Sequence, residues 1–355
     1  MSEITQHWLN NENFDLILKF LKEKYVHWAN KPAFDGYFKW KYLDKAEQNS
    51  ALLVKDNGSV VALCGNIPFV LDYGNQSLKA GWISDFNVSE TQQGKGLGKL
   101  ALSAVINNNE ATACLIATKQ AEIVYKKLGM LMDNSPHLYL FIVNKRRFKV
   151  AKTNSPIKKL AHHILNLFNN HKNIPEITPS ISLAFDETER FNESYNDYWI
   201  NNVIDNKLIA MRRYADNLNH FLAYPIPGTT AYIIKNNNTI LGHALIRVET
   251  DVYGLKRGRI IDLILPFNNN YYSTMESCIR YLLQKMINKD RVDYIEAIAS
   301  HPIQKKGYLN NHFIDRSTLN LWYIINNSKQ PIEHQWVTSF LDKDNALRGA
   351  ATGPF

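Results

Sequence analysis

The chain has 355 residues, of which 45% are hydrophobic and 21% charged, and its formal net charge at pH 7 is +8. This length and ordinary composition predict about two globular domains and exclude a disordered or collagen-like protein. The cysteines Cys64, Cys114 and Cys278 form no CxxC pair, which predicts no disulfide framework and fits a reducing cytoplasm. The N-terminus shows no secretory pattern and the apolar runs are too short to cross a membrane, so we expect a cytoplasmic protein without a membrane partner.

The positive charge is spread along the chain and is not concentrated on one face of a predicted helix. Nucleic acid is therefore not an expected partner, whereas small molecules that carry phosphate suit the charge. The adjacent His162 and His163 have no further ligands at metal spacing, so we expect no metal.

Two parts of the chain repeat the same order of predicted elements. A β-hairpin over 51–66, with the turn KDNGS, aligns without a gap to 231–246, with the turn KNNNT. Asn and Gly tolerate the positive φ that tight hairpin turns need. Each hairpin is followed by a strand, at 81–88 and 258–265, and then by a helix, at about 95–107 and 272–289.

The repeat continues to the end of each part. Short strands are expected at 114–118 and 294–299, short helices near 125–130 and 303–308, and final β-rich runs at 138–143 and 318–325. The offsets of 177–180 residues indicate a duplicated α/β domain. We predict domains at 1–145 and 179–330, joined by a polar, basic connection at 146–178. The tail at 331–355 has few apolar residues, so we expect it to return along the surface.

A glycine-rich turn links the strand that ends at Val88 to the helix that follows. Glycine occupies every second position over 94–98, which lets backbone N–H groups converge at the positive end of a helix. Such a loop suits a pyrophosphate, to which Lys95 and Lys99 add charge. Its spacing fits neither the Walker A loop nor the GxGxxG dinucleotide fingerprint.

With Gln93 in front, this loop resembles the Q/R-x-x-G-x-G/A motif of the GCN5-related N-acetyltransferases, the GNAT superfamily. The segment 121–130 is similar to the family's A-x-x-x-Y-x-x-x-G-F sequence, although Met130 replaces Phe and Thr118 stands where Asn often occurs. The resemblance covers about residues 1–143. It implies an α/β fold of two tandem GNAT-like domains, each a mixed sheet flanked by helices, with the second degenerate at the coenzyme A loop.

The resemblance also implies an acyl-CoA-dependent N-acyltransferase (EC 2.3.1 type) in which an amine attacks the thioester directly. Acetyl-CoA or another short-chain acyl-CoA would be the co-substrate, held by the loop amides at its pyrophosphate and by strand backbone along its pantetheine arm. The residues implied in this binding are Phe86, Val88, Gln93, Gly94, Lys95, Gly96, Leu97, Gly98 and Lys99.

This reaction needs a neutral amine and a stabilised leaving thiolate. Asp85 is a candidate base or orienting carboxylate, but the matching Asp262 in the other half fits a structural role equally. Ser84 is a candidate proton relay, although strand alternation places it on the opposite face from Asp85 unless a bulge intervenes. Tyr125 matches the family position that hydrogen-bonds the CoA sulfur, or it is a packed core tyrosine. His137 could reach the same cleft or lie on the surface.

The second half lacks the features of this loop. Tyr271, Ser273 and Met275 stand at the three glycine positions, and Ile303 stands at the position of Tyr125. Side chains there would obstruct a pyrophosphate, so we expect this half to have lost coenzyme A. It would serve as a scaffold or bind the acceptor.

Tandem GNAT chains with one degenerate copy include peptidoglycan aminoacyltransferases, protein N-myristoyltransferases and N-acyltransferases of nucleotide-linked amino sugars. This chain is similar to the third group, the anthrose-type dTDP-4-amino-4,6-dideoxyglucose N-acyltransferases, in length, in its intact first loop and in the segments 37–43, 82–85 and 336–344. The implied acceptor is a dTDP-4-amino-4,6-dideoxyhexose for a surface glycan such as an O-antigen. An amino acid, peptide or aminoglycoside acceptor and a non-catalytic acyl-CoA-binding protein remain alternatives.

Aromatic and basic residues of the second half could hold the nucleotide. Trp199, Tyr214 and Tyr224 could stack a base or sugar, and Arg212 and Arg213 could pair with a diphosphate. Core packing and a surface helix end explain these residues equally well. An oligomer is possible, but nothing in the sequence indicates one.

Overall fold

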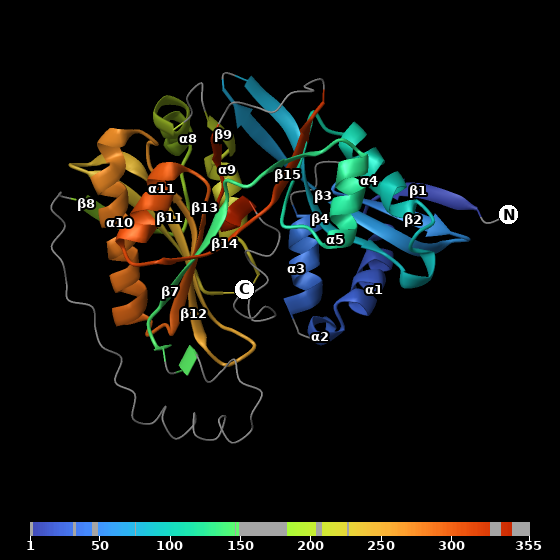
Figure 1. Ribbon diagram of the computed structural model, residues 1–355, viewed down its shortest axis with the longest axis horizontal. Helices are drawn as coiled ribbons and strands as arrows, with labels where there is room; N and C mark the ends of the chain where they lie inside the picture. The colour runs from blue at the N-terminus through green and yellow to red at the C-terminus, as the bar shows by residue number, and fades with distance from the viewer. Residues whose placement is uncertain are drawn as a thin grey trace.

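The computed structural model describes residues 3–30, 33–44, 49–74, 76–145, 147–148, 183–203, 208–225, 227–326 and 335–342. The predicted connection from 149 onward, with His162 and His163, lies outside the described residues. In the described part, two lobes lie side by side, and each is a mixed sheet with helices packed against it (Figure 1). The predicted fold class, an α/β protein with two mixed sheets, is confirmed. Within these residues, no helix is long and apolar enough to span a membrane.

Both predicted hairpins are present. The first joins β2 (Ala51–Asp56) to β3 (Ser59–Tyr73), and the second joins β10 (Thr229–Asn236) to β11 (Thr239–Thr250). In both turns the two central residues have positive φ, 48° and 80° in the first and 46° and 67° in the second. This backbone twist matches the twist of the flanking strands, which is why Asn and Gly predict the turns correctly.

The first sheet has the strand order β1-β2-β3-β4-β5-β15-β6. Adjacent residues of its strands belong to different hydrophobic clusters on its two faces, as the alternation of strand side chains requires. The helices α4 (Leu97–Asn107) and α5 (Lys119–Lys127) pack on one face, and α1 (Phe14–Lys24) and α3 (Ala33–Tyr42) on the other. The other strands in this order are β1 (Ile4–Trp8), β4 (Gln76–Val88), β5 (Ala111–Leu115), β6 (Leu131–Asp133) and β15 (Leu321–Ile325), and two further strands of the same sheet, β9 (Leu208–Met211) and β16 (Gln335–Val337), branch from β3.

The second sheet has the order β14-β7-β13-β12-β11-β10-β8. One face is covered by α10 (Tyr272–Gln284), the π-helical turn η4 (Lys285–Lys289) and α11 (Pro302–Asn310), which share a hydrophobic cluster with the strands. The strands beside its hairpin are β7 (His137–Ile142), β8 (Leu183–Thr188), β12 (Lys256–Ile264), β13 (Tyr294–Ala299) and β14 (Ile314–Thr318).

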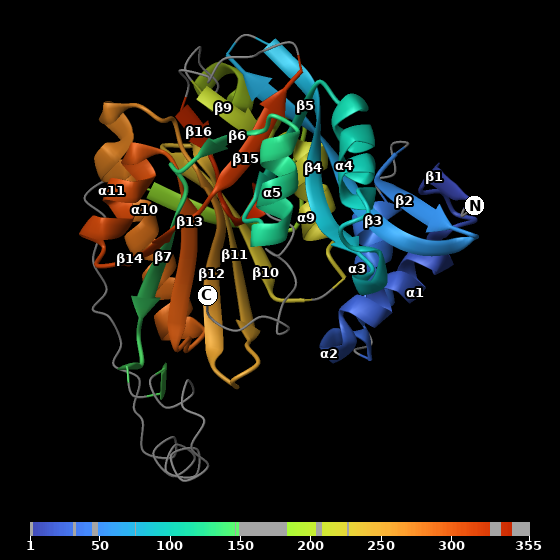
Figure 2. The same ribbon diagram turned by 45° about the vertical axis from the view of Figure 1, so that its right-hand side comes forward.

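The two lobes exchange strands. β7, the final strand of the first half, pairs with β13 and β14 in the second sheet, and β15 of the second half pairs with β5 and β6 in the first. Figure 2 shows β15 running beside β5. Neither half therefore completes its own sheet. Both runs are short and apolar, so the local pattern fits either sheet, and the choice of sheet depends on long-range contacts. The boundaries 1–145 and 179–330 stay predictions about the sequence.

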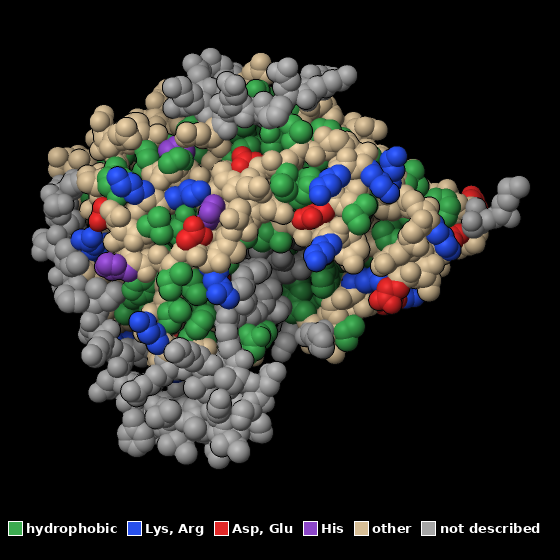
Figure 3. Space-filling view, viewed as in Figure 1, with side chains coloured by type: hydrophobic (Ala, Val, Ile, Leu, Met, Phe, Trp, Pro, Cys, Tyr) green, Lys and Arg blue, Asp and Glu red, His purple; other side chains and the backbone are tan. Residues whose placement is uncertain are grey.

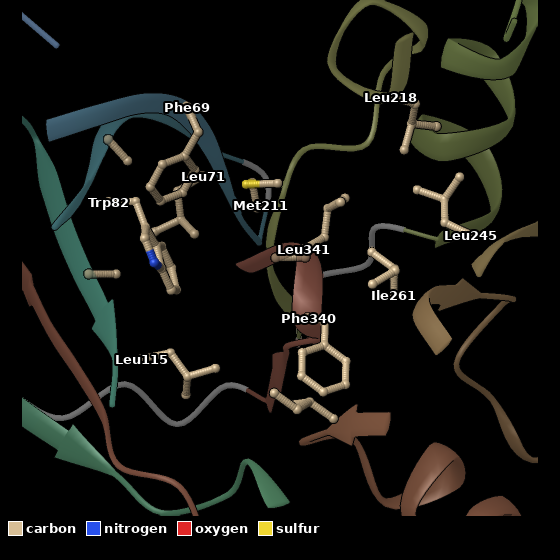
Figure 4. Packing of buried hydrophobic residues seen from close by; sticks show 14 of the residues in the cluster. Phe69, Leu71, Trp82, Leu115, Met211, Leu218, Leu245, Ile261, Phe340 and Leu341 are labelled. Carbon is tan, nitrogen blue, oxygen red and sulfur yellow. The ribbon is translucent and has the colours of Figure 1, made fainter. Parts of the chain in front are cut away.

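A hydrophobic cluster joins the lobes, and the described part of the tail contributes to it. β16 (Gln335–Val337) pairs with β9 (Leu208–Met211), which pairs with β3 of the first lobe. The expectation of a surface tail is wrong over 335–342, because apolar side chains there are buried in this cluster. Figure 4 shows the residues that meet between the sheets, among them Phe69, Leu71, Trp82, Met211, Leu245, Ile261, Phe340 and Leu341.

A buried ionic network also fixes the tail to the second sheet. Arg213 donates to Asp262 Oδ2 over 2.9 Å and to Asp342 Oδ2 over 2.8 Å. His243 Nε2 contacts the same oxygen of Asp262 over 3.0 Å. Burial raises the pKa of Asp262, but the charge of Arg213 and the hydrogen bond with His243 outweigh it and lower this pKa, whereas burial outweighs Arg213 and raises the pKa of Asp342. Arg213 is therefore not exposed to bind a diphosphate.

Asp262→Asn is expected to lower the free energy of unfolding by about 3–5 kcal/mol, because it leaves Arg213 buried with a weakened partner. Asp342→Asn, the matched control, is expected to cost less, since Arg213 keeps its ion pair with Asp262 and burial already opposes the charged form of Asp342. Because the pKa of Asp262 is lowered, its contribution is present at neutral pH and is lost as the pH falls below about 4. Urea unfolding of both variants at several pH values measures this difference, and equal losses would contradict it.

Candidate functional site

The neighbouring parallel strands β4 and β5 pair over only part of their length. Ala80–Trp82 pair with Ala111–Ala113, and beyond Trp82 the two strands are no longer paired. The last residues of β4 therefore border a gap at the carboxyl ends of two parallel strands. Ligands of open α/β sheets bind at such edges, outside the carboxyl ends of the strands.

The glycine-rich loop lies at the end of β4, beside this gap. Gly94 and Gly96 have φ of 81° and 83°, and Gly96 is the N-cap of α4. The first N–H groups of a helix lack partners within it and attract anions. Gly98 allows close packing of α4 on β4, because an added Cβ would lie 3.2 Å from the Phe86 ring. Lys95 and Lys99 are exposed, whereas Leu97 is part of the hydrophobic core.

A bulge in β4 brings Ser84 and Asp85 to the same side. Asn87 pairs with Leu63 and Ser84 with Gly65, so two residues of β4 stand opposite Cys64 alone. Asp85 has a φ of 44°, an unusual conformation for a residue in a strand. Ser84 and Asp85 therefore do not alternate between the two faces, because a bulge intervenes, which the sequence analysis named as the exception. The Tyr42 hydroxyl bonds both side chains, over 2.9 Å to Ser84 Oγ and 2.6 Å to Asp85 Oδ2.

Asp85 is the centre of a buried polar cluster. Its Oδ2 accepts from Lys41 Nζ over 2.6 Å as well as from Tyr42, and its Oδ1 accepts from the Tyr25 hydroxyl over 2.7 Å. The side chains of Lys41 and Asp85 are 2% and 0% exposed. Burial, and next the negative charge of Asp85, raise the pKa of Tyr42 well above its usual value, so this hydroxyl stays a donor.

Sequence reasoning missed Tyr25, Lys41 and Tyr42, which come from the end of α1 and from α3. The aromatic run 37–42 is part of the core, because Tyr37, Phe38 and Tyr42 are buried. The available signal was Lys41, a lysine within a run of buried aromatic residues. A buried ammonium needs a counter-charge, and the sequence could have prompted a search for one.

Tyr125 is a buried member of the hydrophobic core, as its alternative interpretation expected, and its side chain contacts both β4 and β5. Its ring stacks on Phe86 of β4 at 6.2 Å between centroids, and its hydroxyl donates to Cys114 Sγ of β5 over 3.4 Å. Trp322 of the exchanged strand β15 packs edge-on against the same ring at 5.8 Å. The structure thus brings together Ser84, Asp85, Phe86 and Tyr125. The glycine-rich loop follows directly on β4, the strand that holds the first three.

The second lobe contains a corresponding divergence of β12 and β13, but a side chain occupies it. These strands pair only over Arg257–Ile260 and Tyr294–Ala297, and the Gln304 side chain of α11 donates to the Leu263 carbonyl over 2.8 Å. Gln304 is buried, and Met275, at a glycine position of the first loop, is buried in the core. The Leu263 carbonyl of β12 is therefore not open to a ligand in the manner proposed for β4.

The remaining sequence candidates lie elsewhere. His137 contacts Asp315 over 2.8 Å at the edge of the second sheet, and Trp199 and Tyr224 are buried core residues. Arg212 and Tyr214 line a surface pocket of about 350 Å³ with Asp72, which pairs with Arg212. Ser77 of this pocket is eight residues from Asp85 along β4, about 25 Å at the usual rise per residue. A nucleotide in this pocket is therefore far from Asp85.

Residues 14–130 match the profile of the family described as the Acetyltransferase (GNAT) family. This segment belongs to the GNAT family. The GNAT domain contains the gap, the glycine-rich loop and the Asp85 cluster, and members of its family transfer acyl groups from acyl-CoA. Residues 14–130 are accordingly an acyltransferase domain of the GNAT family, and acyl-CoA is the co-substrate typical of that family.

Over most of its length the chain is similar in fold to solved structures at low identity. A GCN5-related N-acetyltransferase from Anabaena variabilis shares 13% identity over 92% of this chain and 73% of its own, with a TM-score of 0.61. An Enterococcus faecalis protein described as a probable N-acyltransferase shares 9% over 93% and 74%, with a TM-score of 0.60. Saccharomyces cerevisiae N-myristoyltransferase with bound myristoyl-CoA shares 12% over 91% and 83%, with a TM-score of 0.58. These likenesses show the fold alone, and no curated protein sequence matches the GNAT-containing chain.

Proposed function

We propose that the protein is an N-acyltransferase whose acyl-CoA lies in the gap between β4 and β5. The observation that carries this proposal is the juxtaposition, at one sheet edge, of unpaired β4 backbone, a helix N-terminus with two left-handed glycines, and a buried acid cluster. Backbone of Phe86–Val88 pairs with the pantetheine arm. The loop amides from Gln93 to Lys99 hold the pyrophosphate, and the two loop lysines add charge.

In the proposed acyl transfer, separate roles belong to Asp85, Ser84 and Tyr125. Asp85 has no exposed side-chain surface, so it acts on the amine at one remove, as the final proton acceptor and orienting group. Ser84 joins it through Tyr42. Tyr125, with its ring on Phe86, donates its proton to the thiolate that leaves.

The transferred acyl group is short. The polar side chains around Asp85 are closely packed: an added Cβ at Gly65 of β3 would lie 2.3 Å from the Tyr42 hydroxyl and 2.4 Å from Ser84 Oγ. A long aliphatic chain that entered this packing would separate these groups from their hydrogen-bond partners, which costs free energy. Acetyl-CoA or another short-chain acyl-CoA avoids this cost.

The acceptor we propose is the amino group of a nucleotide-linked sugar of the dTDP-4-amino-4,6-dideoxyhexose type. Its support is the resemblance of segments 37–43 and 82–85, which now form one cluster, because Lys41 and Tyr42 hold Ser84 and Asp85. The net charge of +8 suits two anionic substrates. On the face seen in Figure 3, Lys and Arg are scattered over both lobes and not gathered as nucleic acid would require.

Calorimetric titration tests the proposal with CoA, and with dTDP and UDP at saturating CoA. We expect one CoA per chain, because Gln304 fills the second gap, and dTDP binding that survives CoA saturation. CoA binding without nucleotide binding would contradict the nucleotide sugar and direct the search to amino acids, peptides and aminoglycosides. Binding of acetyl-CoA without thiol release with any amine would contradict catalysis.

A further inference from the structure

Access to Asp85 is controlled by one of the side chains that donate to it. Lys41 and Tyr42 are buried and both bond Oδ2, whereas Tyr25 bonds Oδ1 and is half-buried. The carboxylate itself has no exposed surface. Of these three donors, Tyr25 alone connects the carboxylate to the surface of the molecule. We propose that Tyr25 is a further catalytic residue, whose hydroxyl takes the proton of the attacking amine and passes its own proton to Asp85.

The position of Tyr25 fits this task. It ends α1 and directly precedes α2 (Val26–Ala29), so its backbone lies at a break between two helices. The next residue, Val26, is 64% exposed, which places this break at the surface. The Tyr25 ring stacks on Phe38 at 6.2 Å and 14°, which holds its hydroxyl against Asp85. A substrate amine that comes from the surface at this break meets Tyr25 before Asp85.

The proposed step balances without a further reactant. The ammonium group first loses one proton to the Tyr25 oxygen while the Tyr25 proton moves to Asp85 Oδ1. The neutral nitrogen then bonds to the thioester carbonyl carbon, the C–S bond breaks, and the second proton of the nitrogen passes to the CoA thiolate through Tyr125 or water, which leaves Tyr125 protonated. Asp85 later returns the first proton to solvent through Tyr25. Lys41, bonded to Oδ2, fixes the carboxylate throughout.

This inference rests on the proposed acyl transfer, and the experiment separates the two. Thiol release from acetyl-CoA is measured with 2-aminoethanol, an ammonium ion at neutral pH, and with hydroxylamine, a neutral amine. For Tyr25→Phe we expect turnover with 2-aminoethanol to fall about 100-fold or more, a smaller fall with hydroxylamine, and unchanged CoA affinity. Tyr281→Phe is the matched control, since Tyr281 is half-buried and stacks on Phe185 in the second lobe.

The kinetics of Tyr25→Phe and of the wild type distinguish failure of the relay from failure of the acyl transfer. Unchanged turnover of Tyr25→Phe, or an equal loss with both amines, would overturn the relay and leave the transferase intact. No thiol release by the wild type with either amine, while acetyl-CoA binds, would overturn the transfer reaction and the relay together. If Tyr25→Phe is poorly folded, Tyr25→His replaces the proton carrier by an imidazole. Its turnover should then rise with pH near 6.5, and a profile identical to the wild type would contradict the proposal.

Discussion

Gly96→Val is expected to weaken CoA binding at least about 100-fold. Gly96 has a φ of 83° at the N-cap of α4, a conformation that a β-branched residue adopts only with strain. An added Cβ meets no atom within 4 Å, so the valine does not clash within the protein. It projects into the space proposed for the pyrophosphate, and relief of its strain turns the loop amides away. Calorimetry with CoA measures the loss.

Gly254→Val is the matched control for this variant. Gly254 also has a positive φ, 74°, and an added Cβ there also meets nothing within 4 Å, but it lies between β11 and β12 of the second lobe. Both variants should lose similar stability from backbone strain, and only Gly96→Val should lose CoA. Equal CoA affinity in the two folded variants would contradict the assignment of the loop.

The parts of the fold that depend on local sequence were predictable. The turns at 57–58 and 237–238 need positive φ at two successive residues, which Asn and Gly indicate directly. The strand–loop–helix unit around Gly96 was equally clear, because glycine spacing and the helix start are local features. The exchange of β7 and β15 was not predictable in this way. Each run is a short apolar strand whose local pattern fits either sheet, and only the long-range contacts of the folded chain decide between them.

The site was predictable in part for the same reason. Ser84, Asp85 and Tyr125 adjoin recognisable motifs, but the partners of Asp85 lie 43 to 60 residues away, in segments whose aromatic residues indicate only a core. Strand alternation failed at Asp85, because the bulge depends on the pairing of β4 with β3 and not on β4 alone.

The corresponding aspartates of the two repeats have different surroundings. Asp262 corresponds to Asp85, and each is buried against a cation, Arg213 or Lys41. Asp85 therefore also has the structural role that the sequence left open, since it forms an ion pair with Lys41. Asp85 differs in its positive φ and in its bond to the half-buried Tyr25. Strained residues persist where the surroundings hold them and cluster at functional sites, which favours a chemical role for Asp85 over a purely structural one.

Truncation of the protein after residue 145 is expected to abolish both folding and CoA binding. The fragment 1–145 contains the loop, the gap and the Asp85 cluster, yet we expect it to be unfolded and to bind no CoA. It lacks β15, which pairs with all five residues of β5 and supplies Trp322 behind Tyr125. It also exposes β7, whose Leu138, Tyr139 and Leu140 are buried in the second sheet. Circular dichroism and calorimetry with CoA measure both losses.

The complementary fragment makes this test specific. When 1–145 and 146–355 are produced together, each supplies the strand that the other sheet lacks, so we expect a 1:1 complex that binds CoA. Trp322→Ala in the second fragment should weaken the complex, because it leaves a cavity against Tyr125. A folded 1–145 fragment with full CoA affinity would show that the exchanged strand is dispensable. The lobes could then be treated as independent domains, and the proposed acyl site would be complete without any residue of the second half.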